Sequence, residues 1–125
     1  MTGNHKLSSI VFTLLLMLLL PAASGQTGKH TFALGEEEFL LDGKPFQIIS
    51  GEMHPGRIPA EYWKHRIEMA RAMGCNTVSA YLFWNHHEAR EGVYDFHTGN
   101  RDISRFIATA AEEGMWVIIR PGPYV

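Results

Sequence analysis

After residue 38, the first hydrophobic segments of the chain are two short apolar runs. Residues 39–41 and 46–49 are mostly apolar, and the turn sequence Asp42-Gly43-Lys44-Pro45 separates them. Apolar runs on either side of Asp-Gly predict a β-hairpin or a sharp corner between strands. The polar segment that follows, residues 50–57, contains two glycines and a proline. It is therefore expected to be a loop without regular secondary structure.

Apolar residues that recur every three or four positions predict two helices. The first begins at Pro59 and ends at Gly74, and the second covers residues 102–113 and stops at Gly114. The predicted buried faces consist of Trp63, Ile67, Ala70 and Met73 in the first helix, and of Ile103, Phe106, Ile107, Ala110 and Ala111 in the second.

Two longer apolar segments, residues 76–83 and 115–119, are predicted strands. A long loop is expected between residues 84 and 101, after the first of them. The order strand, helix, strand, helix, strand, with a last strand that is apolar throughout, predicts an α/β fold whose parallel sheet is covered on both faces. Both a doubly wound open sheet and an eight-stranded (β/α)8 TIM barrel have this order.

The loops favour the barrel. The first strand-to-helix connection lacks the glycine-rich fingerprint of dinucleotide-binding open sheets. Polar and aromatic residues instead follow every strand, as in a barrel whose site is built from all of these loops. A barrel needs about 250 residues, so the chain is expected to be a truncated N-terminal fragment, with about three of eight strands and an open sheet edge.

The first 25 residues are typical of a secretory signal peptide. Lys6 precedes an apolar block at residues 10–20, which is too short to span a membrane, and small residues follow at 21–25. Three segments are therefore expected: the signal peptide (1–25), a lead-in with the hairpin (26–45) and the partial catalytic barrel (46–125). The protein is expected to be periplasmic or secreted, with no membrane span after cleavage.

Charge and cysteine content narrow the possible partners. The formal net charge is -2 with acidic and basic residues interspersed, so the chain lacks the cationic stripe that binding to nucleic acid requires. The single cysteine, Cys75, has no partner for a disulfide. It is interpreted as a small buried apolar residue.

Polar and titratable residues gather after the predicted strands, where they would share one rim of a parallel sheet. Two kinds of site fit them: a metal site, and a carbohydrate site in which aromatic rings stack on sugars while polar groups bind hydroxyls. The metal site is disfavoured, because adjacent histidines on an extended segment point in opposite directions and no His-Glu-x-x-His helix is present. A purely structural role for these residues stays open. The rim residues are Glu52, His54, Arg57, Trp84, Asn85, His86, His87, Glu88, Arg120 and Tyr124.

A series of motifs in one order resembles the start of the glycoside hydrolase family 35 β-galactosidases. The resemblance covers about residues 39–125. The motifs are residues 41–46 (LDGKPF), 50–54 (SGEMH), 57–59 (RIP), 62–63 (YW), 74–78 (GCNTV), 81–85 (YLFWN), 87–88 (HE), 92–96 (GVYDF) and 120–124 (RPGPY).

The resemblance implies a (β/α)8 barrel that hydrolyses terminal, non-reducing β-galactosyl residues of oligosaccharides or polysaccharides with retention. It implies one glutamate as acid/base and another as nucleophile, both beyond residue 125, so the chain itself is expected to be inactive. It also implies no metal and no organic cofactor. Two alternatives stay open: another retaining barrel glycosidase, such as a β-glucosaminidase, and a noncatalytic carbohydrate-binding barrel.

The resemblance also implies roles for individual residues. Tyr81 matches the family tyrosine that contacts galactose, and Trp84, Asn85 and Glu88 match a Trp-Asn-x-His-Glu pattern near the substrate. The arginines at 57 and 120 match motif residues that hold carboxylates or loops in place. Pro55 stands where many members have tyrosine, so a contact between the first loop and the sugar is not expected from the resemblance. Glu52 stands where relatives can carry a neutral residue, so it is not expected to be catalytic.

Overall fold

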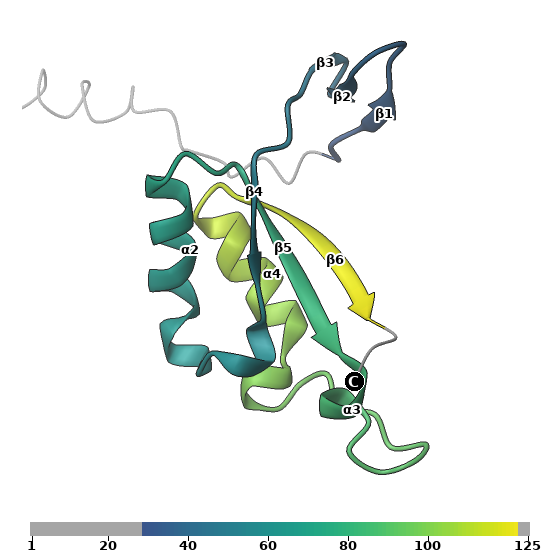
Figure 1. Cartoon of the computed structure of the whole chain (residues 1–125), viewed down its shortest axis with the longest axis vertical. Coiled ribbons are helices and arrows are strands. Elements are labelled where there is room, and N and C mark those ends of the chain that lie inside the picture. Colours follow the sequence, from purple (N-terminus) through teal and green to yellow (C-terminus); the bar gives the residue numbers. More distant parts are fainter. Residues whose placement is uncertain (1–28, 123–125) are drawn as a thin grey trace, which may run out of the picture.

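The computed structural model describes residues 29–122, which form two separate three-stranded sheets and two main helices (Figure 1). The predicted signal peptide and Tyr124 lie outside the described residues. Within residues 29–122, no helix combines the length and the apolar character that crossing a membrane requires.

The small antiparallel sheet lies at one end of the molecule (Figure 1). It contains β1 (Phe32–Leu34), β2 (Phe39–Leu41) and β3 (Lys44–Pro45) in that order. Asp42 and Gly43 join β2 to β3 with φ angles of 52° and 73°, the backbone that an Asp-Gly hairpin turn requires. The predicted hairpin is confirmed, although residues 46–49 lie outside its strands.

The main sheet is parallel and has the order β4 (Ser50–Met53), β5 (Thr77–Phe83), β6 (Trp116–Gly122). The strands predicted at 76–83 and 115–119 are thus confirmed, and β6 continues through Arg120 and Pro121. The prediction of a loop over residues 50–57 was wrong. Residues 50–53 pair with Thr77–Ala80 of β5, because hydrogen bonding to a buried neighbouring strand outweighs the low strand propensity of a glycine. Residues 55–57 form the 3-10 helix η1 (Pro55–Arg57).

The two predicted helices are present. A 3-10 turn, η2 (Ala60–Tyr62), leads into α2 (Trp63–Ala72), and α4 (Ile103–Glu112) follows β5 in the chain. Gly74 and Gly114 follow their C-terminal ends with φ angles of 92° and 69°, which only glycine adopts without strain. The predicted loop at 84–101 contains two further short helices, α3 (Trp84–His87) and η3 (Gly99–Arg101).

The core lies between the main sheet and the two helices. It consists of Trp63, Ile67, Ala70, Val78, Ala80, Phe106, Ala110 and Met115. Three residues predicted to be buried are not. Met73, Ile107 and Ala111 are exposed, because each helix turns only a narrow stripe of its surface toward the sheet and the neighbouring positions lie at its border.

Both helices cover the same face of the main sheet. Trp63 and Ile67 of α2 and Phe106 of α4 pack with Val78 and Ala80, which lie two positions apart on β5 and therefore point to one side. Among the described residues the opposite face carries no helix (Figure 1), and Trp116 and Ile118 of β6 are more than one-third exposed. The α/β class is confirmed, whereas covering of both faces is not found within residues 29–122.

Candidate functional site

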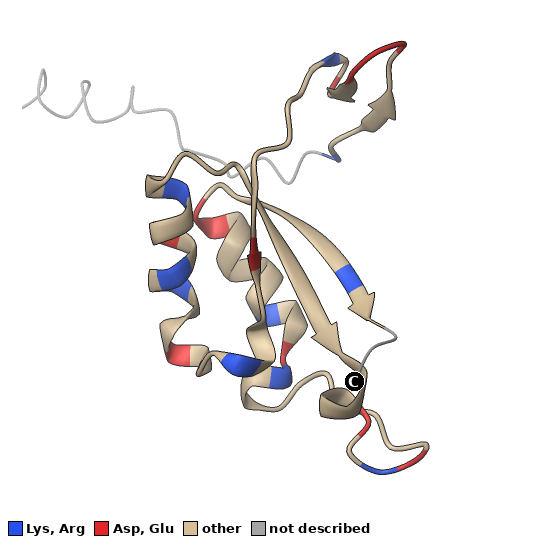
Figure 2. Cartoon of the chain, viewed as in Figure 1, with Lys and Arg blue, Asp and Glu red and all other residues tan. Residues whose placement is uncertain are grey.

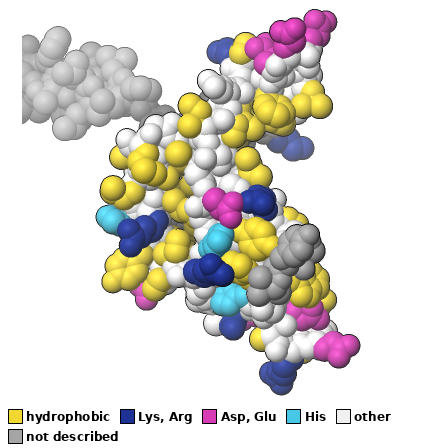
Figure 3. Space-filling model, in the orientation of Figure 1, with side chains coloured by type: hydrophobic (Ala, Val, Ile, Leu, Met, Phe, Trp, Pro, Cys, Tyr) yellow, Lys and Arg dark blue, Asp and Glu magenta, His cyan; other side chains and the backbone are white. Residues whose placement is uncertain are grey.

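The helix-free face of the main sheet carries a cluster of polar and aromatic side chains. Because Val78 and Ala80 of β5 point toward the helices, Ser79, Tyr81 and Phe83 point to the opposite side. Figure 3 shows acidic, basic and histidine side chains gathered at the centre of the visible surface. We call this helix-free side of β4, β5 and β6 the open face.

An ion pair crosses the open face from β4 to β6, which Figure 2 shows as an acidic position on β4 and a basic one on β6. The Arg120 Nη1 atom donates to Glu52 Oε2 at 2.5 Å. The other carboxylate oxygen of Glu52 lies 2.8 Å from His54 Nε2. The hydrogen bond with His54, and then the positive charge of Arg120, hold the pKa of Glu52 below its ordinary value against the opposing effect of burial. Glu52 is therefore ionised at neutral pH.

Tyr81 lies among aromatic and charged neighbours at the C-terminal end of β5. Its ring centroid is 5.1 Å from that of Phe83 and 5.7 Å from that of His54. The Arg120 guanidinium carbon is 5.5 Å from the Tyr81 ring centroid, within the range of a cation–π contact. Arg57 completes the cluster, with its guanidinium carbon 4.5 Å from the Phe83 ring centroid.

The lack of a side chain at Gly122 leaves space for the Tyr81 ring. Gly122 lies opposite Phe83 in the register of β5 and β6. A Cβ atom on Gly122 would lie 1.9 Å from both Cζ and Oη of Tyr81. Only glycine at this position is compatible with the observed ring.

The other three predicted substrate residues lie in the segment after β5. Trp84 is 54% exposed, and its ring centroid is 5.8 Å from that of Tyr94. Asn85 is exposed on α3. Glu88 Oε1 accepts a hydrogen bond from the Gly92 amide at 2.7 Å, so its carboxylate helps to close this loop. Tyr81 thus belongs to the open face, whereas the contacts of Trp84 and Glu88 lie within residues 84–94.

The adjacent histidines have structural surroundings. His87 is buried, with Nδ1 2.9 Å from the Asp95 carbonyl oxygen and its ring stacked on Phe96 at 4.7 Å. The His86 ring packs on Gly56, and burial lowers its pKa. Because both lie on the short helix α3, they are not on the extended segment that the sequence predicted. No group of three histidine, cysteine or acidic side chains within residues 29–122 could hold a metal ion.

Sequence reasoning missed parts of this cluster. It did not single out Phe83 or Gly122, and it left His54 without a role. Phe83 could have been found from strand periodicity, because it lies two positions after Tyr81 and therefore faces the same side. The role of Gly122 depends on a ring in another strand, which no local pattern indicates.

Comparison with known proteins identifies the family. A model described as "Glycosyl hydrolases family 35" matches residues 38–125. The chain belongs to glycosyl hydrolases family 35. Its relatives in this family include a protein from Xanthomonas manihotis named "Beta-galactosidase", which is 48% identical over 112 residues. That alignment covers 89% of this chain and 19% of the relative.

Mammalian relatives in family 35 are also similar to most of this chain. A dog protein named "Beta-galactosidase" is 42% identical over 120 residues, which are 93% of this chain and 18% of the relative. A human protein named "Beta-galactosidase-1-like protein 3" is 44% identical over 98 residues, 78% of this chain and 15% of the relative. The chain thus spans about one-fifth or less of the length of these relatives.

Proposed function

We propose that the complete protein is a retaining, exo-acting β-galactosidase that removes terminal, non-reducing β-galactosyl residues from oligosaccharides or polysaccharides. The observation that carries this proposal is the family 35 match over residues 38–125. The relatives named "Beta-galactosidase", at 42% to 48% identity, support the same activity. A glycan is the substrate class that a glycosyl hydrolase requires.

The arrangement of the main sheet supports a (β/α)8 barrel. Its strands follow chain order as β4-β5-β6, and both connecting helices pack on the same face. A doubly wound sheet places helices on both faces, whereas a barrel has all of its helices outside and its strand ends together at one rim. Tyr81 lies at the C-terminal end of β5, where barrel enzymes build their sites.

The charge state of Glu52 explains why we do not propose it as the acid/base. Retaining hydrolysis uses one carboxylic acid that stays protonated until it donates to the leaving group, and a second carboxylate as nucleophile about 5–5.5 Å away. Glu52 is held ionised by His54 and Arg120. On the basis of the family 35 match we propose that both catalytic glutamates lie beyond residue 125 and that residues 1–125 alone are inactive.

We propose that Tyr81 contacts the galactosyl ring from the open face. The same proposal includes Trp84, Asn85 and Glu88 as substrate-binding residues. An exposed indole at Trp84 offers a flat apolar surface for a sugar ring, and the exposed Asn85 carries groups that can hydrogen-bond to hydroxyls. Export through residues 1–25, with a periplasmic or secreted product, is proposed from the signal-peptide pattern alone.

The test is an assay of the complete enzyme on matched aryl β-galactosides and aryl β-glucosaminides. Cleavage of the galactoside with a β-configured product at early times is expected. Cleavage of the glucosaminide alone would show another retaining glycosidase, and cleavage of neither would contradict a hydrolase. Residues 1–125 assayed alone should release no aryl alcohol.

A further inference from the structure

Glu52 lies on the open face next to the level of Tyr81, and its carboxylate contacts two side chains that flank Tyr81. In the strand register Glu52 is opposite Ser79, and Tyr81 is opposite Arg120. His54 follows Glu52 by two positions, and its ring lies near that of Tyr81. Arg120 and His54 therefore lie beside Tyr81 on the side of β6 and on the side of β4.

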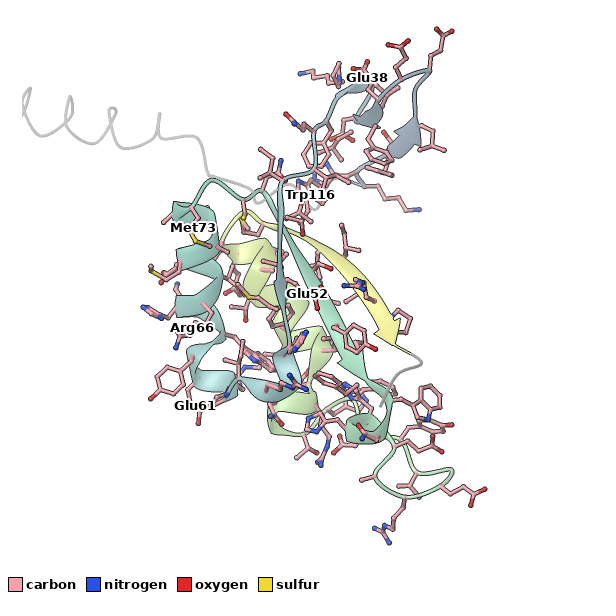
Figure 4. All side chains as sticks on the ribbon, in the orientation of Figure 1. Glu38, Glu52, Glu61, Arg66, Met73 and Trp116 are labelled. Carbon is pink, nitrogen blue, oxygen red and sulfur yellow. The ribbon has the colours of Figure 1, made fainter. Side chains whose placement is uncertain are left out.

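The two oxygens of Glu52 are divided between these neighbours. Oε1 is the atom near His54 Nε2, and Oε2 accepts from Arg120 Nη1. The second bond joins residues 68 positions apart and spans the width of β5. Hydrogen bonds of this kind, in which both partners are ionised, are shorter and stronger than neutral ones. One carboxylate thus restrains the side chains on both sides of Tyr81. Figure 4 labels Glu52 on its strand.

We propose that Glu52 is a positioning residue for substrate binding, which fixes Arg120 and His54 against the Tyr81 ring and so sets the direction of the Tyr81 hydroxyl. This inference rests on the proposed β-galactosidase function, in which that hydroxyl contacts the galactosyl ring. Glu52 acts through its neighbours and takes no part in bond making or breaking.

The first experiment is Glu52→Gln in the complete enzyme. Glutamine keeps the size of the side chain but replaces one acceptor oxygen with a donor group, which cannot accept from Arg120 or His54. We expect kcat/KM to fall roughly tenfold or more, mostly through KM, because a group that binds the ring in both ground and transition states affects KM first. The matched control is Glu61→Gln, which changes an exposed glutamate on η2 away from the open face (Figure 4).

A double-mutant cycle tests whether Glu52 acts through Arg120. Arg120→Lys keeps the positive charge but loses the planar guanidinium that lies over Tyr81. If the two residues act as one unit, the double variant loses little more activity than the worse single variant. If the fold-loss in activity of the double variant equals the product of the two single fold-losses, Glu52 does not act through Arg120.

A measurement without turnover separates this inference from the proposed function. 3-Fluorotyrosine is placed at position 81, and its ¹⁹F signal is compared in wild type, Glu52→Gln and Glu61→Gln. A shifted or broadened signal in Glu52→Gln alone, with Tm unchanged, supports positioning even if the enzyme cleaves no galactoside. An unchanged signal together with unchanged kcat/KM would overturn the positioning role of Glu52. If the enzyme still cleaves the galactoside in that experiment, the proposed function is unaffected.

Discussion

The Tyr81 ring occupies space that the missing side chain of Gly122 leaves free. A Cβ atom at Gly122 would overlap the Tyr81 phenol, at 1.9 Å from Cζ and Oη. Non-bonded carbon atoms lie about 3.5–4 Å apart, so the two groups cannot coexist without movement. The position of a predicted substrate residue on β5 thus depends on a glycine in the neighbouring strand β6.

Gly122→Ala is expected to displace the Tyr81 ring. A shift of about 1 Å in a positioning group can lower activity by roughly a hundredfold, and we expect a fall of that order in kcat/KM of the complete enzyme. The control is Gly51→Ala on β4, where the new Cβ would meet only Cys75 Sγ at 3.6 Å, an ordinary contact. Equal activity of the two variants would contradict the steric argument.

Tyr81→Phe is expected to keep the ring packed between its neighbours and to remove only the hydroxyl. The loss of the proposed hydrogen bond to the sugar should lower kcat/KM about tenfold or more, with Tm close to that of wild type. Tyr62→Phe, which changes a tyrosine that is 57% exposed next to α2, is the matched control. Steady-state kinetics on an aryl β-galactoside would exclude Tyr81 from the site if both variants match wild type.

Trp63→Ala is expected to lower the free energy of unfolding by about 3–5 kcal/mol. Trp63 is 1% exposed, packs edge-to-face on Phe106 at 5.4 Å, and donates from Nε1 to the carbonyl oxygens of Pro55 and Ile58. Trp84→Ala removes a tryptophan that is 54% exposed, so it should cost less than about 1 kcal/mol. Urea unfolding of both variants measures the difference, and similar losses would refute this view of the core.

The stability of the protein is expected to fall as the pH drops through the range in which His86 titrates. Burial lowers the pKa of His86 from its ordinary value of 6.5. Just below pH 6.5, His86 is therefore protonated in the unfolded chain but still neutral in the folded chain. This contribution to stability is complete above the unfolded pKa and decreases as the pH falls toward the folded pKa.

His86→Gln should therefore weaken the pH dependence. We expect a smaller change in unfolding free energy between about pH 7.5 and about pH 5.5 than in wild type. His65→Gln, at an exposed position on α2, should keep the wild-type dependence. Carboxylates without a charge interaction with His86, such as Asp42, whose pKa is lowered first by a hydrogen bond from the Thr31 amide, contribute equally in all three proteins and cancel in the comparison.

The sequence was sufficient for elements whose residue pattern by itself indicates the element. The helix over residues 63–72 follows from the spacing of Trp63, Ile67 and Ala70, and β5 follows from a β-rich run directly after Gly74. It was insufficient for β4, where a glycine lies inside a strand that exists because β5 offers it hydrogen bonds. Propensity is a weak guide wherever a neighbour in space supplies the stabilising contacts.

For the site, the sequence by itself determined the family and singled out Tyr81, because each motif is a short continuous segment and Tyr81 lies in the last three residues of an apolar strand. Only the tertiary structure decided which residues surround it. Glu52 and Arg120 are 68 positions apart, and Gly122 lies beside Tyr81 because β5 and β6 pair in one register. Such contacts depend on how strands align, and residue spacing along one chain segment carries no information about that alignment.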